Sequence, residues 1–344
     1  MDPIIVILIV AAVVFAITSF LYGVFRKFSQ MSWVGWQILL VFPLTRFAAL
    51  LSNEVLTPGA QLWFTIFIMV GSIALVLGLG ALLRLAMLKK RMPAHGAWRF
   101  ADRLMGGITA FVDYAVIALI VGAGVLTFMH YCMTPPELFA PIYESPIWTD
   151  ILKEHGFDLI VVTVFLFALR EGWRVGFARV AVIILMLALT VGAVIVSIYL
   201  GIGLGGLSES DSIAQAISIT AVILISLLAI IFILAFYAVK FIRNVRYHYF
   251  WGTIDGLLGA VLAFAVMFVA ACAVNCGVAW IASGTAMSAI ENFLASLPFD
   301  VPDMSEILIQ IQAWGEGIQS LLMSSPIAKA LYAGNPMMGG MLIG

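Results

Sequence analysis

The chain carries little charge. Asp, Glu, Lys and Arg make up 10% of its 344 residues, whereas a soluble domain carries about 25% because its surface must stay hydrated. An ordinary water-soluble protein is therefore excluded. The net charge of −1 also argues against a nucleic acid partner, since binding to phosphates needs clustered basic residues.

Cysteine and histidine are scarce too, with three and four residues. Three cysteines do not make a disulfide framework, and Cys272 and Cys276 lie four residues apart in an apolar run, which indicates packed thiols. No metal-ligand cluster accompanies them, so we predict no metal and no other cofactor. The sequence also lacks His-Glu-x-x-His, Gly-x-Ser-x-Gly and a phosphate-binding loop. We therefore predict no catalytic activity.

Apolar residues are abundant, at 64% with a mean hydropathy of +1.14. Apolar runs of roughly 20 residues are long enough to cross a bilayer as helices, because lipid offers no hydrogen-bond partner to an open backbone. We predict an all-α polytopic membrane protein with eight transmembrane helices, at residues 3–25, 31–52, 61–84, 105–128, 157–175, 180–200, 214–239 and 256–281.

The chain repeats itself at an offset of 153 residues, so that each copy is one four-helix unit. An even number of spans gives both copies the same orientation, as in transporters with parallel repeats. We predict two parallel four-helix repeats at 1–156 and 157–281, followed by an external amphipathic segment at 282–344. The matching pairs include Gly23 and Gly176, Arg26 and Arg179, Trp98 and Trp251, Asp102 and Asp255, and Gly106 and Gly259.

The basic residues predict the orientation. With residue 1 outside, all but three of the 17 Lys and Arg fall on the inner side, as the positive-inside rule requires. The exceptions are Arg46, Lys153 and Lys329. We predict that both termini lie outside the cytoplasm.

Each copy is predicted to end in a short external helix. Ser145-Pro146-Ile147 and Ser325-Pro326-Ile327 both place Ser at the N-cap and Pro at the first helical position. Before the second of these, Asp303–Glu306 resembles a capping box. The helix that follows it is expected either to lie on the outer membrane surface or to pack across the outer ends of the spans. Its apolar stripe is Ile307, Ile311, Trp314, Ile318 and Leu321/Leu322.

The most specific recurring pattern is Trp-x-x-x-Asp-x-Leu-x-Gly, which opens the fourth helix of each copy. We expect Asp102 and Asp255 either to meet the positive end of their own helix or to pair with a basic residue of the other inner loop. Trp98 and Trp251 fit an interfacial aromatic belt.

Small residues follow in the same helices. Gly106 with Ala110, and Gly259 with Ala263, are small-xxx-small pairs that allow helices to approach closely. We expect close packing at the interface between the repeats rather than a ligand site.

A second recurring pattern, Gly-x-x-Arg, stands at Gly23–Arg26 and Gly176–Arg179. We interpret it as an anchor at the inner surface combined with a helix break.

Asp113 is the clearest ionisable residue inside a predicted span, and such a residue suggests a function. Its repeat counterpart is Val266, so the two copies differ at this position. Two roles stay open for Asp113: proton or ion exchange, and a hydrogen bond to a neighbouring helix.

The order of these residues resembles the colicin V production protein family. Asp158, Gly176-Phe177-Ala178-Arg179 and Asp255-Gly256-Leu257-Leu258-Gly259 carry the resemblance in the second copy. Two departures are that this chain has two units where family members usually have one, and that Asp2 is displaced by about one helical turn from the register of Asp158.

The resemblance implies a bacterial inner-membrane protein in toxin production, export or envelope homeostasis, with no established reaction. Two alternatives are a transporter or channel with a pathway between the repeats, and a scaffold that binds a periplasmic partner. Expected partners are the lipid bilayer and a membrane or periplasmic protein; a homo-oligomer stays open.

Overall fold

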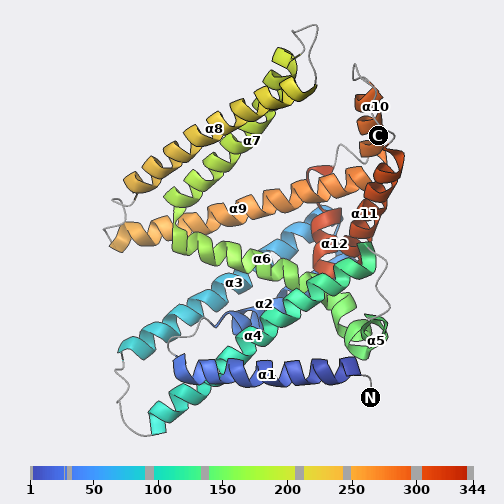
Figure 1. Ribbon diagram of the computed structural model, residues 1–344. Coiled ribbons are helices and arrows are strands. Elements are labelled where there is room, and N and C mark those ends of the chain that lie inside the picture. Colours follow the sequence, from blue (N-terminus) through green and yellow to red (C-terminus); the bar gives the residue numbers. More distant parts are fainter. Residues whose placement is uncertain are drawn as a thin grey trace. The chain divides into compact units, whose positions relative to one another are not determined.

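The computed structural model describes residues 3–26, 28, 33–89, 97–132, 139–205, 213–242, 249–295 and 304–338. In these ranges every regular element is a helix and no strand occurs (Figure 1). The elements are α1 (Pro3–Arg26), α2 (Val34–Val55), α3 (Pro58–Lys89), α4 (Ala97–Cys132), α5 (Ala140–Tyr143), the π-helical turn η3 (Ile147–Leu152), α6 (Lys153–Val175), α7 (Phe177–Gly205), α8 (Ile213–Ile242), α9 (Tyr249–Ala282), α10 (Thr285–Ala295), α11 (Ser305–Ser324) and α12 (Pro326–Ala333).

The long helices make the chain a multi-pass membrane protein. α2, α3, α4, α7 and α9 each contain a described stretch that is long and apolar enough to cross a bilayer. α1 and α8 contribute shorter apolar stretches, Val10–Arg26 and Ile219–Leu234. α6 also covers a predicted span, but Asp158 and three charged residues near its other end lower its hydropathy. The class is confirmed, while the count of eight spans and the repeat stay predictions.

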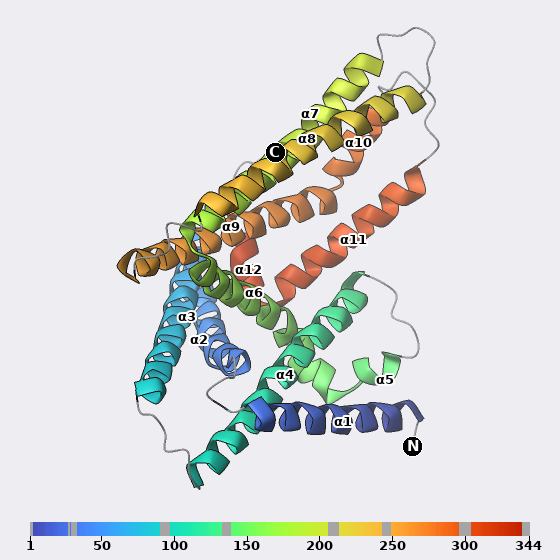
Figure 2. The ribbon, with the colours of Figure 1, turned by 60° about the vertical axis from the view of Figure 1, so that its left-hand side comes forward.

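The chain forms two compact units whose boundaries differ from the predicted repeat boundaries. One unit joins Met1–Leu166 to Val269–Gly344, and the other is Phe167–Phe268. The predicted boundaries at 156 and 281 fall near the ends of α6 and α9, whereas the observed ones fall inside these helices. In the smaller unit, α7 and α8 pack along each other (Figure 2).

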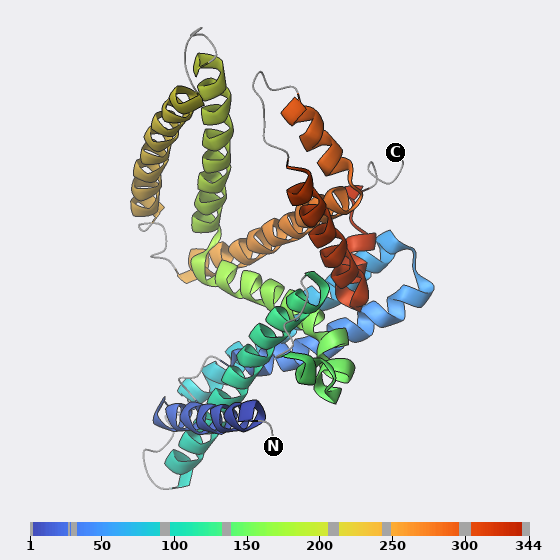
Figure 3. The same cartoon turned by 45° about the vertical axis from the view of Figure 1, so that its right-hand side comes forward.

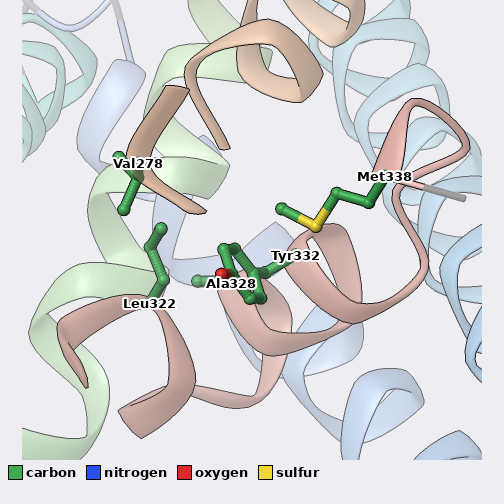
Figure 4. Packing of buried hydrophobic residues seen from close by; sticks show 5 residues of the cluster. All are labelled: Val278, Leu322, Ala328, Tyr332 and Met338. Atoms are coloured by element: carbon green, nitrogen blue, oxygen red, sulfur yellow. The ribbon is translucent and has the colours of Figure 1, made fainter. Parts of the chain in front are cut away.

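In the larger unit, α1 packs against α4, and α2 pairs with α3 (Figure 3). The C-terminal segment packs onto this bundle: α11 contacts α4, and α12 contacts α2 and α3. Most of α12 is buried, and Ala328 and Tyr332 join Val278, Leu322 and Met338 in one apolar cluster (Figure 4). Burial raises the pKa of the Tyr332 hydroxyl, to which Gln319 donates a hydrogen bond at 2.8 Å.

The segments around the two Ser-Pro-Ile motifs differ from expectation. Ile147–Leu152 is a π-helical turn that continues directly into α6, so it is no separate helix at the end of the first copy. α12 does begin at Pro326, but Ser325 makes no side-chain cap. Asp303 of the predicted capping box lies outside the described residues.

The buried face of α11 agrees with the predicted stripe only in part. Of the stripe, Leu321 and Leu322 are buried, whereas Ile307 and Trp314 are exposed. Leu308 and Gly315, which lie outside the predicted stripe, are buried as well. The reason is close packing through glycine: a Cβ on Gly315 would lie 2.5 Å from Ile281. α11 therefore also uses a small residue to approach its neighbours, and a search for large apolar residues alone misses Gly315.

Candidate functional site

A buried polar contact in the larger unit lies around Asp113. This residue sits in α4 with 4% of its surface exposed, and its Oδ1 accepts a hydrogen bond from the Gly35 N–H at 2.7 Å. Gly35 is the second residue of α2, where a backbone N–H has no partner within the helix. Asp113 thus supplies the N-terminal cap of α2 from another helix. This contact is of the second kind expected for Asp113, a hydrogen bond to a neighbouring helix.

Glycine is needed at position 35 because the two helices meet there. A Cβ on Gly35 would lie 2.7 Å from the Asp113 Cα and 2.8 Å from the Val112 carbonyl oxygen. Real Cβ atoms do not approach backbone atoms this closely, so a larger residue would push α2 away from α4.

Trp33, just before α2, has a left-handed backbone with φ of 58°. A residue with a Cβ rarely adopts this conformation. The side chain holds it in place: the Trp33 ring stacks on Phe28 at 4.7 Å, its Nε1 donates to the Phe28 carbonyl oxygen, and it packs near Ala110 and Tyr114.

The same arrangement recurs in the smaller unit. Gly176 stands just before α7 with φ of 85°, and the N–H of Ala178, the second residue of α7, donates to Asp255 Oδ1 at 3.1 Å. The two sites therefore correspond residue by residue: Trp33 to Gly176, Gly35 to Ala178, and Asp113 to Asp255. The carboxylate of Asp255 caps a different helix of the same copy, a role that the sequence analysis did not predict for it.

This correspondence departs from the sequence repeat. Asp255 follows Asp113 by 142 residues and Ala178 follows Gly35 by 143, whereas the repeat offset is 153. The capping carboxylate of the second copy therefore lies about three helical turns closer to the start of the fourth helix than that of the first copy. Val266 is the counterpart of Asp113 by sequence alone, and the expected asymmetric carboxylate is instead a feature of both copies.

Asp102 of α4 is the counterpart of Asp255 in the sequence repeat. α4 begins at Ala97 and α9 at Tyr249, so Asp102 and Asp255 lie in the second turn rather than at their own helix start. Both are half-buried. Trp98 and Trp251 fall in the first turns of α4 and α9, and their side chains lie outside the described part of the structure.

The predicted glycines lie at close helix contacts. A Cβ on Gly23 would collide with the Gly106 carbonyl oxygen and lie 2.5 Å from the Ala110 Cβ. In the smaller unit, a Cβ on Gly172 would lie 2.5 Å from the Gly259 carbonyl oxygen and 2.6 Å from the Ala263 Cβ. These contacts join the first and fourth helices of one copy, whereas we expected them between the copies.

The Gly-x-x-Arg pattern behaves differently in the two copies. α1 continues through Gly23 to Arg26, so the expected helix break is absent at Gly23, while Gly176 does separate α6 from α7. Arg26 is exposed and lies 5.3 Å from the centre of the Tyr22 ring. Arg179 is in the first turn of α7 with a buried Nε.

A third carboxylate cap was missed by the sequence analysis. Asp158 of α6 is 0% exposed, and its Oδ1 accepts from the N–H groups of Ile327 at 2.9 Å and Ala328 at 3.2 Å. These are the second and third residues of α12. The Ser325-Pro326 start signal predicted the helix, but no local pattern identifies an acceptor so distant in the chain.

The described residues contain no group of three or more His, Cys, Asp or Glu that could hold a metal. No family model, no curated protein and no solved structure matches the chain. What the geometry offers is therefore a set of carboxylates that fix helices.

Proposed function

We propose that the protein is a bacterial inner-membrane component of the colicin V production type, with eight spans in two parallel repeats and both termini in the periplasm. It would act in toxin export or envelope homeostasis without catalysis of its own.

One observation carries this proposal over ion transport. Asp113, Asp158 and Asp255 each accept a backbone N–H at the start of another helix. Such a bond satisfies a group that would otherwise lack a partner. The bond holds the carboxylate in one position against a neighbouring helix, as a structural role requires. The arrangement therefore favours a role in architecture and assembly.

The test combines two measurements on the full-length protein. Affinity purification from native membranes is expected to recover a specific protein partner, and reconstituted vesicles are expected to show no flux that depends on Asp113. A deletion strain should show an envelope defect, and Asp113→Asn should complement it from about pH 5 to pH 8. A flux abolished by Asp113→Asn would contradict the proposal and support the transporter alternative.

A periplasmic scaffold is favoured by the exposed side of α11. Ile307, Ile309 and Trp314 are apolar and exposed at 49%, 67% and 52%, whereas α12 is largely buried. A partner would therefore meet α11 first. Replacing these three residues by Ser should abolish capture of the partner if this surface binds it. Unchanged capture would exclude this surface.

A further inference from the structure

The corner between α6 and α7, residues 173–179, lies at a membrane boundary. The apolar stretch of α7 that can cross the bilayer begins at Phe177, and the protein buries few of its residues. Trp173 and Phe177, on either side of the break at Gly176, are 47% and 42% exposed. Exposed aromatic rings are typical of the level of the lipid headgroups. A headgroup can therefore reach this corner directly from the bilayer.

α9 holds the corner in a fixed position. A Cβ on Gly259 would lie 2.6 Å from the backbone nitrogen of Phe177, so the two segments touch through their backbones. Asp255, one turn earlier in α9, accepts the N–H of Ala178 at 3.1 Å. Arg179 is the next residue, and these contacts therefore fix the backbone from which its side chain extends.

Arg179 carries a buried donor without an acceptor. Its side chain is half-buried, and its Nε is buried with no hydrogen-bond partner among the described residues. Leaving such a donor unpaired is costly, and more so when the group is charged. The nearby acids serve other groups, since Asp255 accepts from Ala178 and Glu171 pairs with Arg174 at 2.9 Å. The guanidinium is therefore suited to an anion from outside the protein.

The first copy satisfies its matching arginine differently. Arg26 is the repeat counterpart of Arg179, and its guanidinium lies 5.3 Å from the centre of the Tyr22 ring, which is a cation–π contact. At the repeat offset of 153, Tyr22 corresponds to Val175, which has no ring. The second copy thus has the arginine without this aromatic partner.

We propose that Arg179 binds the phosphate of an anionic phospholipid at the corner between α6 and α7. Guanidinium groups hold phosphate oxygens through paired N–H donors, and basic sites between transmembrane helices on the cytoplasmic side bind anionic headgroups. The distribution of basic residues predicts that this corner lies on that side. The phosphate supplies the acceptor for Nε, and the exposed rings of Trp173 and Phe177 favour a lipid over a free anion. This inference does not depend on the proposed function.

Lipid binding to the purified full-length protein tests the site. Delipidated protein in a neutral detergent is titrated with phosphatidylglycerol, and native mass spectrometry measures the bound lipid. We expect Arg179→Gln to weaken this binding by about tenfold, because charge-assisted hydrogen bonds to the phosphate are lost. Arg26→Gln is the matched control in the first copy, where Tyr22 is the partner of the arginine, and it should leave the affinity unchanged.

Inorganic phosphate, added as a competitor at millimolar concentration, separates a lipid site from a site for free anions and should not displace the lipid. Displacement by phosphate, wild-type affinity of Arg179→Gln, or an equal loss in Arg26→Gln overturns the proposal. If Arg179→Gln does not accumulate, Arg179→Lys keeps the charge but not the paired donors. A weaker affinity of the Lys variant for phosphatidylglycerol then supports the site, and an unchanged affinity overturns it.

Discussion

Asp158 and Ile327 are 169 residues apart in the chain, yet the Ile327 N–H lies 2.9 Å from the Asp158 carboxylate. Both residues are 0% exposed. The bond fixes α12 to α6. It belongs to the same type of contact as Asp113 with Gly35 and Asp255 with Ala178, and the first prediction below rests on this shared geometry.

The role of Asp113 as a cap predicts how its variants differ. Asp113→Ala leaves the Gly35 N–H without its acceptor and should lower the stability of the purified protein by about 1–3 kcal/mol. Asp113→Asn keeps an acceptor oxygen and should lose much less. Thermal unfolding in detergent measures both. Equal losses for Asn and Ala would show that charge, and not hydrogen bonding, is what the site requires.

The glycine contacts predict strong sensitivity to bulk at Gly106 and Gly259. Leu at either position should cost about 1–3 kcal/mol through overpacking and reduce abundance. Gly122 in α4 and Gly277 in α9 have open space around them, so Leu at these positions is the matched control and should be tolerated. Wild-type abundance and thermal stability for both the Gly106→Leu and the Gly259→Leu variants would contradict close packing.

The left-handed backbone at Gly176 predicts a selective cost for a methyl group. Gly176→Ala should destabilise the protein by about 1–3 kcal/mol, because a residue with a Cβ is strained there. Gly192→Ala, in the interior of α7 with open space around it, should be neutral or slightly stabilising because alanine favours helix. The unfolding temperature of the Gly176→Ala variant is expected to be lower than that of the Gly192→Ala variant. Similar unfolding temperatures would contradict backbone strain at position 176.

The predicted orientation can be tested with single cysteines in intact cells. In a background without native cysteines, position 209 should react with an impermeant reagent added from outside. Positions 91 and 244 should react only after the membrane is permeabilised, because basic residues concentrate on the inner side. Strong external labelling at position 91 or 244 would reverse the topology.

Hydropathy predicted the helices well because it is a local property of the chain. Each of the eight predicted spans falls on a helix of the structure, and most of these helices extend further than the span. Hydropathy detects only the part of a helix that lies in lipid and misses its polar ends. For this reason α4 begins at Ala97 and not near residue 105. This extension also places Asp102 in the second turn of its helix.

The caps could not be predicted in the same way because they join distant parts of the chain. A repeat alignment pairs Asp113 with Val266, yet the structure gives the role of Asp113 to Asp255. Seven residues separate α1 from α2 but only one separates α6 from α7, so the second helix of each copy begins at a different place in the repeat. Only the packing of helices against one another shows which carboxylate reaches which N-terminus.

The separation of Asp158 and Ile327 along the chain has a consequence for biosynthesis. A ribosome that has just completed Asp158 must add 169 more residues before the partner of this carboxylate exists. At about 5–20 residues per second, the nascent chain spends on the order of ten to thirty seconds with the site empty. During that interval a chaperone or a second nascent chain can reach it, and synthesis of α12 ends this period.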